Sequence, residues 1–149
     1  MSAPDAILTL VTLGVRDLAR SIAFYEAIGC KRKARSAEGV GFFSAGLVTL
    51  AVYPIDALAR DAGIETSLAG DMPKGFRGVE LAWNCHSEQD VDAAVERARQ
   101  AGAIVSKPPQ KTFWGGYAGH FADPDGHYWE VAHNPVFPLS REGQMRIPD

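Results

Sequence analysis

Residues 13–25 read Leu13-Gly-Val-Arg-Asp-Leu-Ala-Arg-Ser-Ile-Ala-Phe-Tyr25, and they join the end of an apolar segment to an amphipathic one. Asp17 is the expected N-cap of a helix, because its carboxylate can accept hydrogen bonds from the free amides of the first turn. The apolar side chains of this helix repeat along one face, at Leu18, Ile22 and Tyr25. Gly29 supplies the C-terminal stop. The pattern predicts a buried strand over residues 7–15 followed by one helix.

Three short segments after this helix predict a β-meander. They cover residues 31–36, 40–44 and 47–53. Glu38-Gly39 and Ala45-Gly46, which separate them, have the composition of turns. Residues 54–78 collect prolines and glycines and indicate a connection, in which residues 55–62 add a helical turn or two.

The first pattern then returns. Residues 79–85 predict a strand, Ser87 is the expected N-cap with Asp90 three residues on, and the helix ends near Gly102. Its apolar face contains Val91, Val95 and Ala98. The remaining strands are predicted over residues 103–105, 116–121 and 127–133. Between them we expect a proline-containing connection over residues 107–111 and a tight turn at Asp123-Pro-Asp-Gly126.

The order βαβββ therefore occurs twice, which predicts an α+β fold with two similar modules in one domain of 149 residues. The modules span about residues 6–53 and 79–134, and residues 54–78 connect them. Because one helix leaves a face of each four-stranded sheet uncovered, we expect the two sheets to curl around a shared cleft. Residues 135–149 continue neither pattern and are expected to wrap the surface or reach a second subunit.

Composition limits the partners. A net charge of −3 and a pI near 5.8 give no broad basic surface for nucleic acid. No apolar run reaches the roughly 20 residues that cross a bilayer, so no membrane partner is expected. The first residues lack the basic segment of a signal peptide, which predicts a cytoplasmic location. Cys30 and Cys85 lack metal-site spacing and are expected to be free thiols.

Several charged residues receive structural interpretations. Asp123 and Asp125 belong to a turn, and their carboxylates are expected to cap backbone amides rather than to catalyse. Arg16 and Arg20 are expected to face solvent or a second subunit, and His127 is expected at the surface.

Two segments resemble the glyoxalase, bleomycin-resistance and extradiol-dioxygenase family, also called the vicinal-oxygen-chelate family. They are residues 13–25 and Phe121-Ala-Asp-Pro-Asp-Gly-His-Tyr-Trp-Glu130. The resemblance runs from about residue 8 to residue 134, and residues 112–119 and 129–135 look like those of an uncharacterised bacterial branch labelled glyoxalase-like. It implies paired βαβββ modules around a ligand cleft, and a homodimer.

The family's metal-dependent members hold one divalent ion with two side chains from each module. Carried over position by position, these ligands fall on Leu10 and Ala51 in the first module and on Glu80 and Glu130 in the second. Leu10 and Ala51 cannot coordinate an ion through their side chains. No cofactor is therefore certain, and the resemblance leaves at most a weak divalent-metal site formed by the two carboxylates.

Glu80 and Glu130 are the candidate catalytic residues. Strand alternation places Glu130 with Tyr128 and Ala132 on one face, and Glu80 with Ala82. If the two carboxylates lie close together and partly buried, one should keep its proton near neutral pH, giving an acid and a base in one site. The other interpretation is that both are cleft-lining polar groups bonded to neighbours.

The candidate substrate-binding residues are mostly aromatic. They are Phe113, Trp114, Tyr117, His120 and Tyr128, with Leu10 and Ala51 as an apolar wall. Two glycines within residues 113–117 would let backbone approach a ligand closely. Alternatively, Phe113 and Trp114 plug the core where a loop crosses the sheet.

Two functions remain open. In the first, the protein is a glyoxalase-like enzyme, a lyase or isomerase acting on a small oxygen-rich or aromatic molecule. In the second, it is a metal-free protein that sequesters such a molecule, as the bleomycin-resistance branch does. Extradiol dioxygenase chemistry is disfavoured, because it needs two histidines and a carboxylate on iron.

Overall fold

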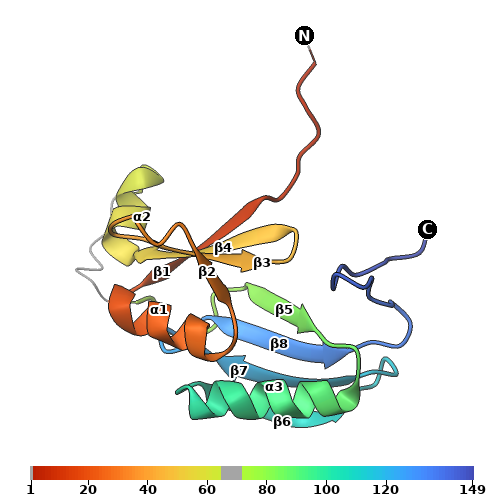
Figure 1. Ribbon diagram of the computed structural model, residues 1–149. Helices are drawn as coiled ribbons and strands as arrows, with labels where there is room; N and C mark the ends of the chain where they lie inside the picture. The colour runs from red at the N-terminus through yellow and green to blue at the C-terminus, as the bar shows by residue number, and fades with distance from the viewer. Residues whose placement is uncertain (1, 65–71) are drawn as a thin grey trace.

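A computed structural model of the protein describes residues 2–64 and 72–149, so residues 65–71 of the expected connection lie outside the described residues. The chain forms two four-stranded mixed sheets with three helices in the described part (Figure 1). The first module contains β1 (Leu10–Val15), α1 (Leu18–Ala27), β2 (Lys31–Lys33), β3 (Gly41–Ala45) and β4 (Val48–Pro54), and α2 (Ile55–Asp61) follows it. The second contains β5 (Glu80–Asn84), α3 (Glu88–Gln100), β6 (Ile104–Lys111), β7 (Tyr117–Ala122) and β8 (Tyr128–His133).

The two sheets have the same topology. Sheet A has the order β1-β4-β3-β2 and sheet B the order β5-β8-β7-β6. In each sheet the first strand of the module runs parallel to the last, and the remaining pairs are antiparallel. Neither sheet closes on itself. The prediction of an α+β fold with two similar βαβββ modules is confirmed.

The predicted helix caps are confirmed. The Asp17 carboxylate accepts a hydrogen bond from the amide of Arg20 at 3.0 Å, and the Ser87 hydroxyl accepts one from the amide of Asp90 at 3.1 Å. Gly29 follows α1 with a φ of 108°, a left-handed conformation that favours glycine. Local chemistry therefore sets where both helices begin and where α1 ends.

The predicted connection over residues 107–111 is wrong, because β6 continues through it to Lys111. The pairing of β6 with β7 shifts register between Val105 and Lys107 and again between Lys107 and Gln110. Prolines are tolerated at such irregularities and on edge strands, and β6 is the edge of sheet B. The first strand is also shorter than predicted, since it begins at Leu10.

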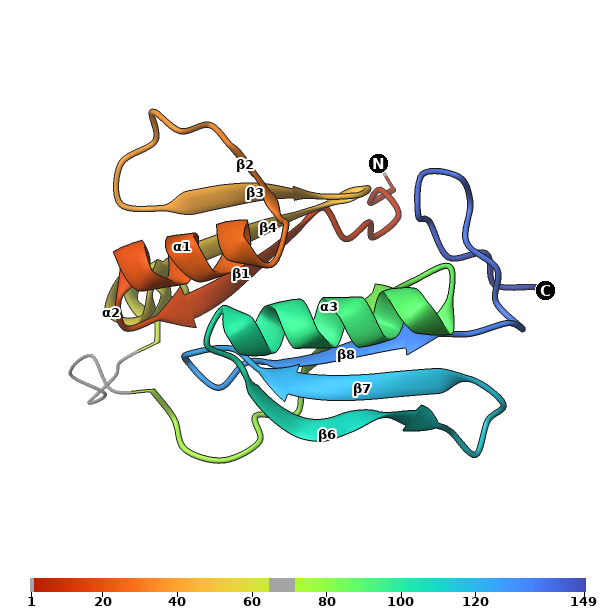
Figure 2. The same cartoon turned by 60° about the horizontal axis from the view of Figure 1, so that its bottom comes forward.

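A single core joins the two modules. On α1, the ring of Tyr25 contacts Phe43 of sheet A and Trp129 of sheet B, with centroid distances of 5.8 and 6.0 Å. Figure 2 shows α1 beside sheet A and α3 along β7 and β8. The helix-bearing faces of both sheets therefore meet in one core. Because side chains alternate along a strand, the remaining positions form an open face on each sheet that points away from this core.

The Asp123–Gly126 turn forms the main polar connection between the modules. The side chain of Asp125 is completely buried and accepts hydrogen bonds from Ser21 Oγ at 3.0 Å and from Arg20 Nη2 at 3.1 Å. It also accepts from the backbone amide and the Nε of Arg16. Both arginine side chains remain exposed to solvent, at 46% and 43%, as expected, but they also pair with Asp125, which was not expected.

Asp123 and His127 complete this connection. Asp123 caps the amides of Asp125 and His127, as predicted, and also accepts the hydroxyl of Tyr25 at 2.6 Å. His127 is half-buried rather than exposed, and its Nε2 lies 2.7 Å from the carbonyl oxygen of Gly14. Free thiols at Cys30 and Cys85 are confirmed. No helix in the described ranges is long and apolar enough to cross a membrane.

Candidate functional site

The open face of sheet B brings three ionisable side chains together. In the parallel pair of β5 and β8, Ala82 lies opposite Glu130, and Glu80 precedes Ala82 by two residues on the same face. In the antiparallel pair of β7 and β8, His120 lies opposite Glu130. The three strands therefore place Glu80, Glu130 and His120 next to one another.

The imidazole of His120 faces both carboxylates. Its Nδ1 lies 3.0 Å from Oε2 of Glu80, and its Nε2 lies 3.9 Å from Oε2 of Glu130. The side chains of Glu80, Glu130 and His120 are 36%, 25% and 23% exposed, so a small molecule can reach them. The short contact at Nδ1 is a hydrogen bond, whereas the longer one at Nε2 leaves room for that nitrogen to meet a ligand.

Burial raises the pKa of the Glu130 carboxyl above its ordinary value, and the negative charge of Glu80 raises it further. The nearby imidazole of His120 acts in the opposite direction. The expectation that Glu80 and Glu130 perturb each other is thus supported for Glu130. A carboxyl in such surroundings gives up its proton less readily than one in water.

The same three side chains have the donor chemistry of a metal site. One nitrogen of His120 and one oxygen from each glutamate all lie within 4.8 Å of one another. A nitrogen with two carboxylate oxygens suits divalent ions of the first transition row, such as Mn²⁺. The residues therefore fit such an ion, and His120 adds a third ligand to the two carboxylates expected from the sequence.

Sequence reasoning placed His120 among the ligand-contacting residues, as a group that could supply a hydrogen bond or relay a proton, and not beside Glu130. Its place beside Glu130 depends on the register of β7 against β8, which alternation along a single strand does not give. Alternation along each strand does predict which residues share a face. Residues 118, 120 and 122 share one face of β7, and residues 128, 130 and 132 share one face of β8.

Leu10 and Ala51 are not brought to this group. Both lie on the open face of sheet A, where Leu10 is 43% exposed and Ala51 is 1% exposed. Ile55 and Leu58 of α2 cover another position of the same face, because a Cβ at Gly14 would collide with them.

Two of the aromatic candidates, Tyr117 and Phe113, lie away from Glu130. Tyr117 is on the helix-bearing face of sheet B, where its hydroxyl donates to Asp92 of α3 at 2.7 Å. This hydrogen bond raises the pKa of the Tyr117 hydroxyl. Phe113 is fully exposed between β6 and β7, so it does not plug the core. Trp114 is half-buried and folds back over Gly116, where no side chain would fit.

Tyr128 shares the open face with the three ionisable residues. It lies opposite Glu80 in the register of β5 and β8. Its ring meets that of Phe76 edge to face, with centroids 5.5 Å apart. Phe76 comes from the connection before β5 and was not expected near the site, because nothing in its local sequence indicates which face it covers. Together the two rings form an aromatic edge beside Glu80.

Solved structures with this fold are similar over nearly the whole chain. A glyoxalase-related enzyme from Fulvimarina pelagi is 31% identical, with a TM-score of 0.84, over 96% of this chain and 99% of that one. A glyoxalase/bleomycin resistance protein/dioxygenase from Nocardioides is 28% identical, with a TM-score of 0.72, over 89% and 85%. A lactoylglutathione lyase from Agrobacterium tumefaciens, 19% identical over 89% and 96% with a TM-score of 0.62, shares the fold alone.

No curated protein sequence matches the chain. A family model, in contrast, matches residues 7–131, which include nearly all of both modules and all three ionisable residues of the open face of sheet B. The chain therefore belongs to the Glyoxalase/Bleomycin resistance protein/Dioxygenase superfamily.

Proposed function

We propose that the protein binds a small organic molecule on the open face of sheet B and transfers a proton there, as a lyase or isomerase. The observation that carries this proposal is the imidazole of His120 standing between the carboxylates of Glu80 and Glu130. An imidazole with a carboxylate at each nitrogen can accept a proton on one side and release one on the other.

Each residue has a distinct role in this proposal. Glu80 accepts the hydrogen bond of Nδ1 and so fixes the ring orientation and tautomer of His120. Nε2 then carries the free lone pair and faces Glu130. Glu130 removes or returns a proton on the bound molecule and exchanges it with Nε2. Tyr128 and Phe76 supply an aromatic edge against which the molecule packs.

The same residues would hold a divalent ion. Glu80, His120 and Glu130 would be its protein ligands, and the ion would polarise an oxygen of the bound molecule. A lone pair that binds an ion cannot accept a proton at the same time. The metal content of the purified protein therefore distinguishes the two mechanisms, ion binding and direct proton transfer by His120.

A homodimer would complete the site. The open face of sheet A presents Leu10 to solvent, and Leu8 and Leu47 nearby are more exposed still. A second copy could lay this apolar surface over the open face of sheet B, with Leu10 as a wall of the ligand site. Burying exposed apolar surface would favour the association. The partners we propose are thus one small-molecule ligand and a second copy of the chain.

The second candidate is metal-free binding and sequestration of an aromatic compound. It is favoured by the apolar side chains at Leu10 and Ala51, the two positions where metal-dependent relatives would need ligands. Affinity would then come from packing on Tyr128, Phe76 and Leu10. Dioxygenase chemistry is not proposed, because the group contains one histidine rather than two.

The first test is the metal content of protein purified without chelator, measured by elemental mass spectrometry. Glu80→Ala and Glu130→Ala are compared with the wild type, and Glu38→Gln is the control because Glu38 is exposed in a distant turn. We expect about one divalent ion per chain in the wild type and control, and loss of the ion in both alanine variants. Absence of an ion from every sample would contradict the metal-assisted form.

Proton transfer is tested separately by deuterium exchange. The protein is incubated in D₂O with a panel of hydroxyketones and 1,3-dicarbonyl compounds, and exchange at carbon is followed by NMR. We expect exchange with the wild type and the Glu38→Gln control, and at least about a 100-fold loss with Glu130→Gln, the upper range for one acid or base group. Equal exchange with Glu130→Gln would contradict catalysis at this site and leave sequestration as the better proposal.

A further inference from the structure

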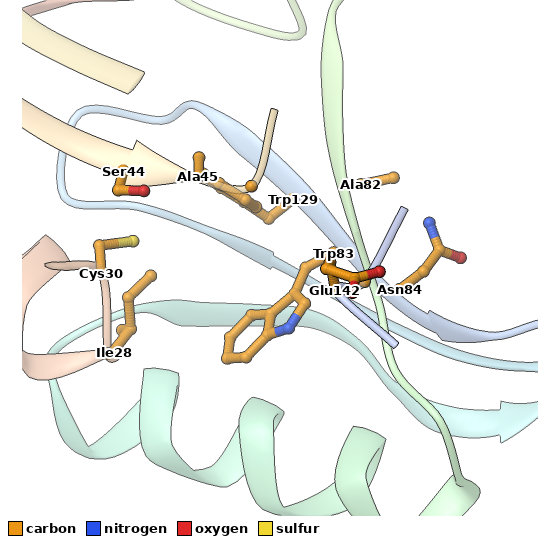
Figure 3. Close-up of a pocket in the computed structure, with 12 residues that line it drawn as sticks. Ile28, Cys30, Ser44, Ala45, Ala82, Trp83, Asn84, Trp129 and Glu142 are labelled. Carbon is orange, nitrogen blue, oxygen red and sulfur yellow. The ribbon is translucent and has the colours of Figure 1, made fainter. Parts of the chain in front are cut away.

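A hollow lies between the two modules, apart from the ionisable group on sheet B. It has a volume of about 350 Å³, and Figure 3 shows the residues that line it. The first module contributes Ile28, Cys30 and Ala45, β5 contributes Trp83, and residues after β8 contribute Glu142. Glu80, His120 and Glu130 do not line it. The hollow is therefore a separate place where a molecule could bind.

The indole of Trp83 is part of the lining of this hollow. In Figure 3 it lies between Ile28 and Cys30 on one side and Asn84 on the other. The indole is half-buried, and among the described residues it has no aromatic ring partner and its Nε1 has no acceptor. Trp129 and Ile28 add buried apolar surface. A flat aromatic ring could pack against Trp83 here.

The polar side chains at the hollow are also available. Ser44, Asn84 and Glu142 line it, and none of them has a side-chain hydrogen bond or ion pair to another described residue. Asn84 is half-buried, whereas Ser44 and Glu142 are exposed, so all three can meet a polar ligand that enters the hollow from solvent. In contrast, the nearby Glu88 on α3 is paired with Lys111.

Glu142 is held in place by an ordered turn. Leu139 and Met145 form an antiparallel bridge, and the amide of Ser140 donates to the carbonyl oxygen of Gln144 at 2.7 Å. The Ser140 hydroxyl in turn accepts from the amide of Gln144. Two backbone connections thus close the turn that carries Glu142. The carboxylate is therefore presented beside β5 by a defined structure.

A groove of about 470 Å³ continues the hollow and brings positive charges next to Glu142. It shares Trp83, Asn84 and Glu142 with the hollow and adds Arg97 and Arg141. Arg97 uses its Nε to donate to the carbonyl oxygen of Ala27 at 2.7 Å, which leaves its two terminal nitrogens available. Asp90 and His86 border the same groove. One surface therefore combines an aromatic ring, a carboxylate and two guanidinium groups.

We propose that this junction binds an aromatic amino acid or a closely related aromatic zwitterion. The aromatic ring packs against Trp83 in the hollow, the ammonium group pairs with Glu142, and the carboxylate pairs with Arg97. Arginine suits this role because its planar guanidinium can donate two hydrogen bonds to one carboxylate. The volume of the hollow is at the small end of the range for ligand sites, which limits the ring to one or two fused cycles. This binding does not depend on the proposed function of Glu130.

Three matched probes test the charge requirement. L-tryptophan carries both charges, tryptamine lacks the carboxylate, and indole-3-propionate lacks the ammonium group. Binding to ¹⁵N-labelled protein is followed by NMR. We expect a Kd of roughly 0.1 to 1 mM for tryptophan, as for other ligands of this size, and binding about five- to tenfold weaker for each analogue. The signal of the Trp83 indole N–H should be among those that shift most.

Single variants then assign each charge. Glu142→Gln should weaken tryptophan and tryptamine about fivefold and leave indole-3-propionate unchanged, as expected for loss of one partly exposed charge pair. Arg97→Gln should weaken tryptophan and indole-3-propionate and leave tryptamine unchanged. Trp83→Leu, which keeps an apolar side chain, should weaken all three, and thermal unfolding checks that this variant remains folded.

The proposal is overturned if tryptophan binds no better than both analogues, or if the Trp83 signal stays fixed while signals around His120 shift. Glu130→Gln separates it from the proposed function. Unchanged tryptophan binding in that variant supports a separate site. Loss of binding in Glu130→Gln would place the ligand on the open face of sheet B and would also overturn the proposal.

Discussion

The two modules share a backbone arrangement but differ in the chemistry of their open faces. Thr12 lies opposite Ala51 in sheet A as Ala82 lies opposite Glu130 in sheet B. Equivalent positions can therefore be assigned from the registers of the two sheets. Three of these pairs are Leu10 and Glu80, Phe42 and His120, and Ala51 and Glu130. Each pair has an apolar side chain in the first module and an ionisable one in the second.

This difference shows how a repeated module can separate two tasks. In sheet A the open face is covered in part by α2, and Ala51 on it is almost fully buried. In sheet B the equivalent positions remain partly exposed and carry the ionisable groups that we propose for proton transfer or ion binding. The same backbone arrangement therefore tolerates an apolar, partly covered open face in the first module and a polar, accessible one in the second. The chemistry proposed for the protein is accordingly confined to the second module.

The turns before β4 and β8 show the same asymmetry. Ala45 and Gly46 connect β3 to β4, and both are exposed. The turn from Asp123 to Gly126 connects β7 to β8 and places a buried carboxylate against α1 of the other module. The predictions below test these differences in order of expected size.

The largest effect is expected from Asp125→Ala. This variant leaves the hydroxyl of Ser21 and the guanidinium groups of Arg16 and Arg20 without their shared acceptor. Removing one partner of a buried charge pair is strongly destabilising, and we expect a loss of about 3 kcal/mol in the free energy of unfolding. Urea unfolding at fixed protein concentration measures it, with Glu38→Ala as the exposed control. A loss below about 1 kcal/mol, the usual scale for a single net hydrogen bond, would show that this connection adds little.

The second prediction compares the equivalent positions His120 and Phe42. His120→Ala should weaken Mn²⁺ binding about 100-fold, because removing a direct ligand costs at least as much as removing the groups that orient one. Phe42→Ala in sheet A is the matched control and should leave Mn²⁺ affinity unchanged. Isothermal calorimetry gives both dissociation constants. An equal loss in the two variants would indicate a general effect of destabilisation and not a metal site in the second module.

The parts of this arrangement that depend on local sequence could be predicted. Asp17 and Ser87 cap helices wherever those helices pack, and alternation alone puts Glu130 and Tyr128 on one face. Alternation along β7 also places Tyr117 and His120 on opposite faces, although the aromatic composition of residues 113–117 suggested a shared pocket. Pairs that depend on register or on packing between modules were not predictable, as with His120 beside Glu130.

The same limit explains the errors. Two adjacent prolines favoured a connection over residues 107–111, but an edge strand with irregular pairing accommodates them. The pairing of the exposed Arg16 and Arg20 side chains with Asp125 was missed because Asp125 is more than 100 residues away in sequence. Phe76 reaches Tyr128 from a connection with no periodicity. The edge strand, the pairs with Asp125 and the contact of Phe76 with Tyr128 all depend on tertiary packing, which no short window of the sequence encodes.

The third prediction concerns the apolar face of sheet A. If a second copy covers this face, Leu10→Asp puts a charge into the interface and should raise the dimer dissociation constant at least about tenfold, which corresponds to roughly 1.4 kcal/mol. Light scattering over a concentration series measures it. Phe113→Asp is the control, because Phe113 is fully exposed in the other module. A wild-type chain that is monomeric at all concentrations would contradict the proposed homodimer.

The smallest effect is expected from Glu130→Gln, which tests whether the Glu130 carboxylate on the open face of sheet B lowers the free energy of unfolding. The pKa of Glu130 is raised by burial and by Glu80, so the folded protein holds this proton more tightly than the unfolded chain does. Stability is therefore lost as pH rises through the unfolded pKa of about 4.3 towards the raised folded value, and the loss is constant above it. Glutamine cannot ionise and avoids this loss. We expect the variant to be roughly 0.5 kcal/mol more stable than the wild type at pH 8, the usual size for a substitution that removes no packing, and nearly equal at pH 4.

Urea unfolding at both pH values, with chelator present to remove any ion, measures this difference. Glu38→Gln should show none at either pH, because Glu38 is exposed to solvent. A variant that is less stable than the wild type at pH 8 would mean that the charged form of Glu130 is favoured by the fold. In that case Glu130 would resemble Asp125, a carboxylate kept for structure, and the contrast between the two open faces would no longer support a proton-transfer site. A gain that appears only at high pH would instead show that the protein keeps a destabilising charge at this position, as expected where the carboxylate is needed for chemistry.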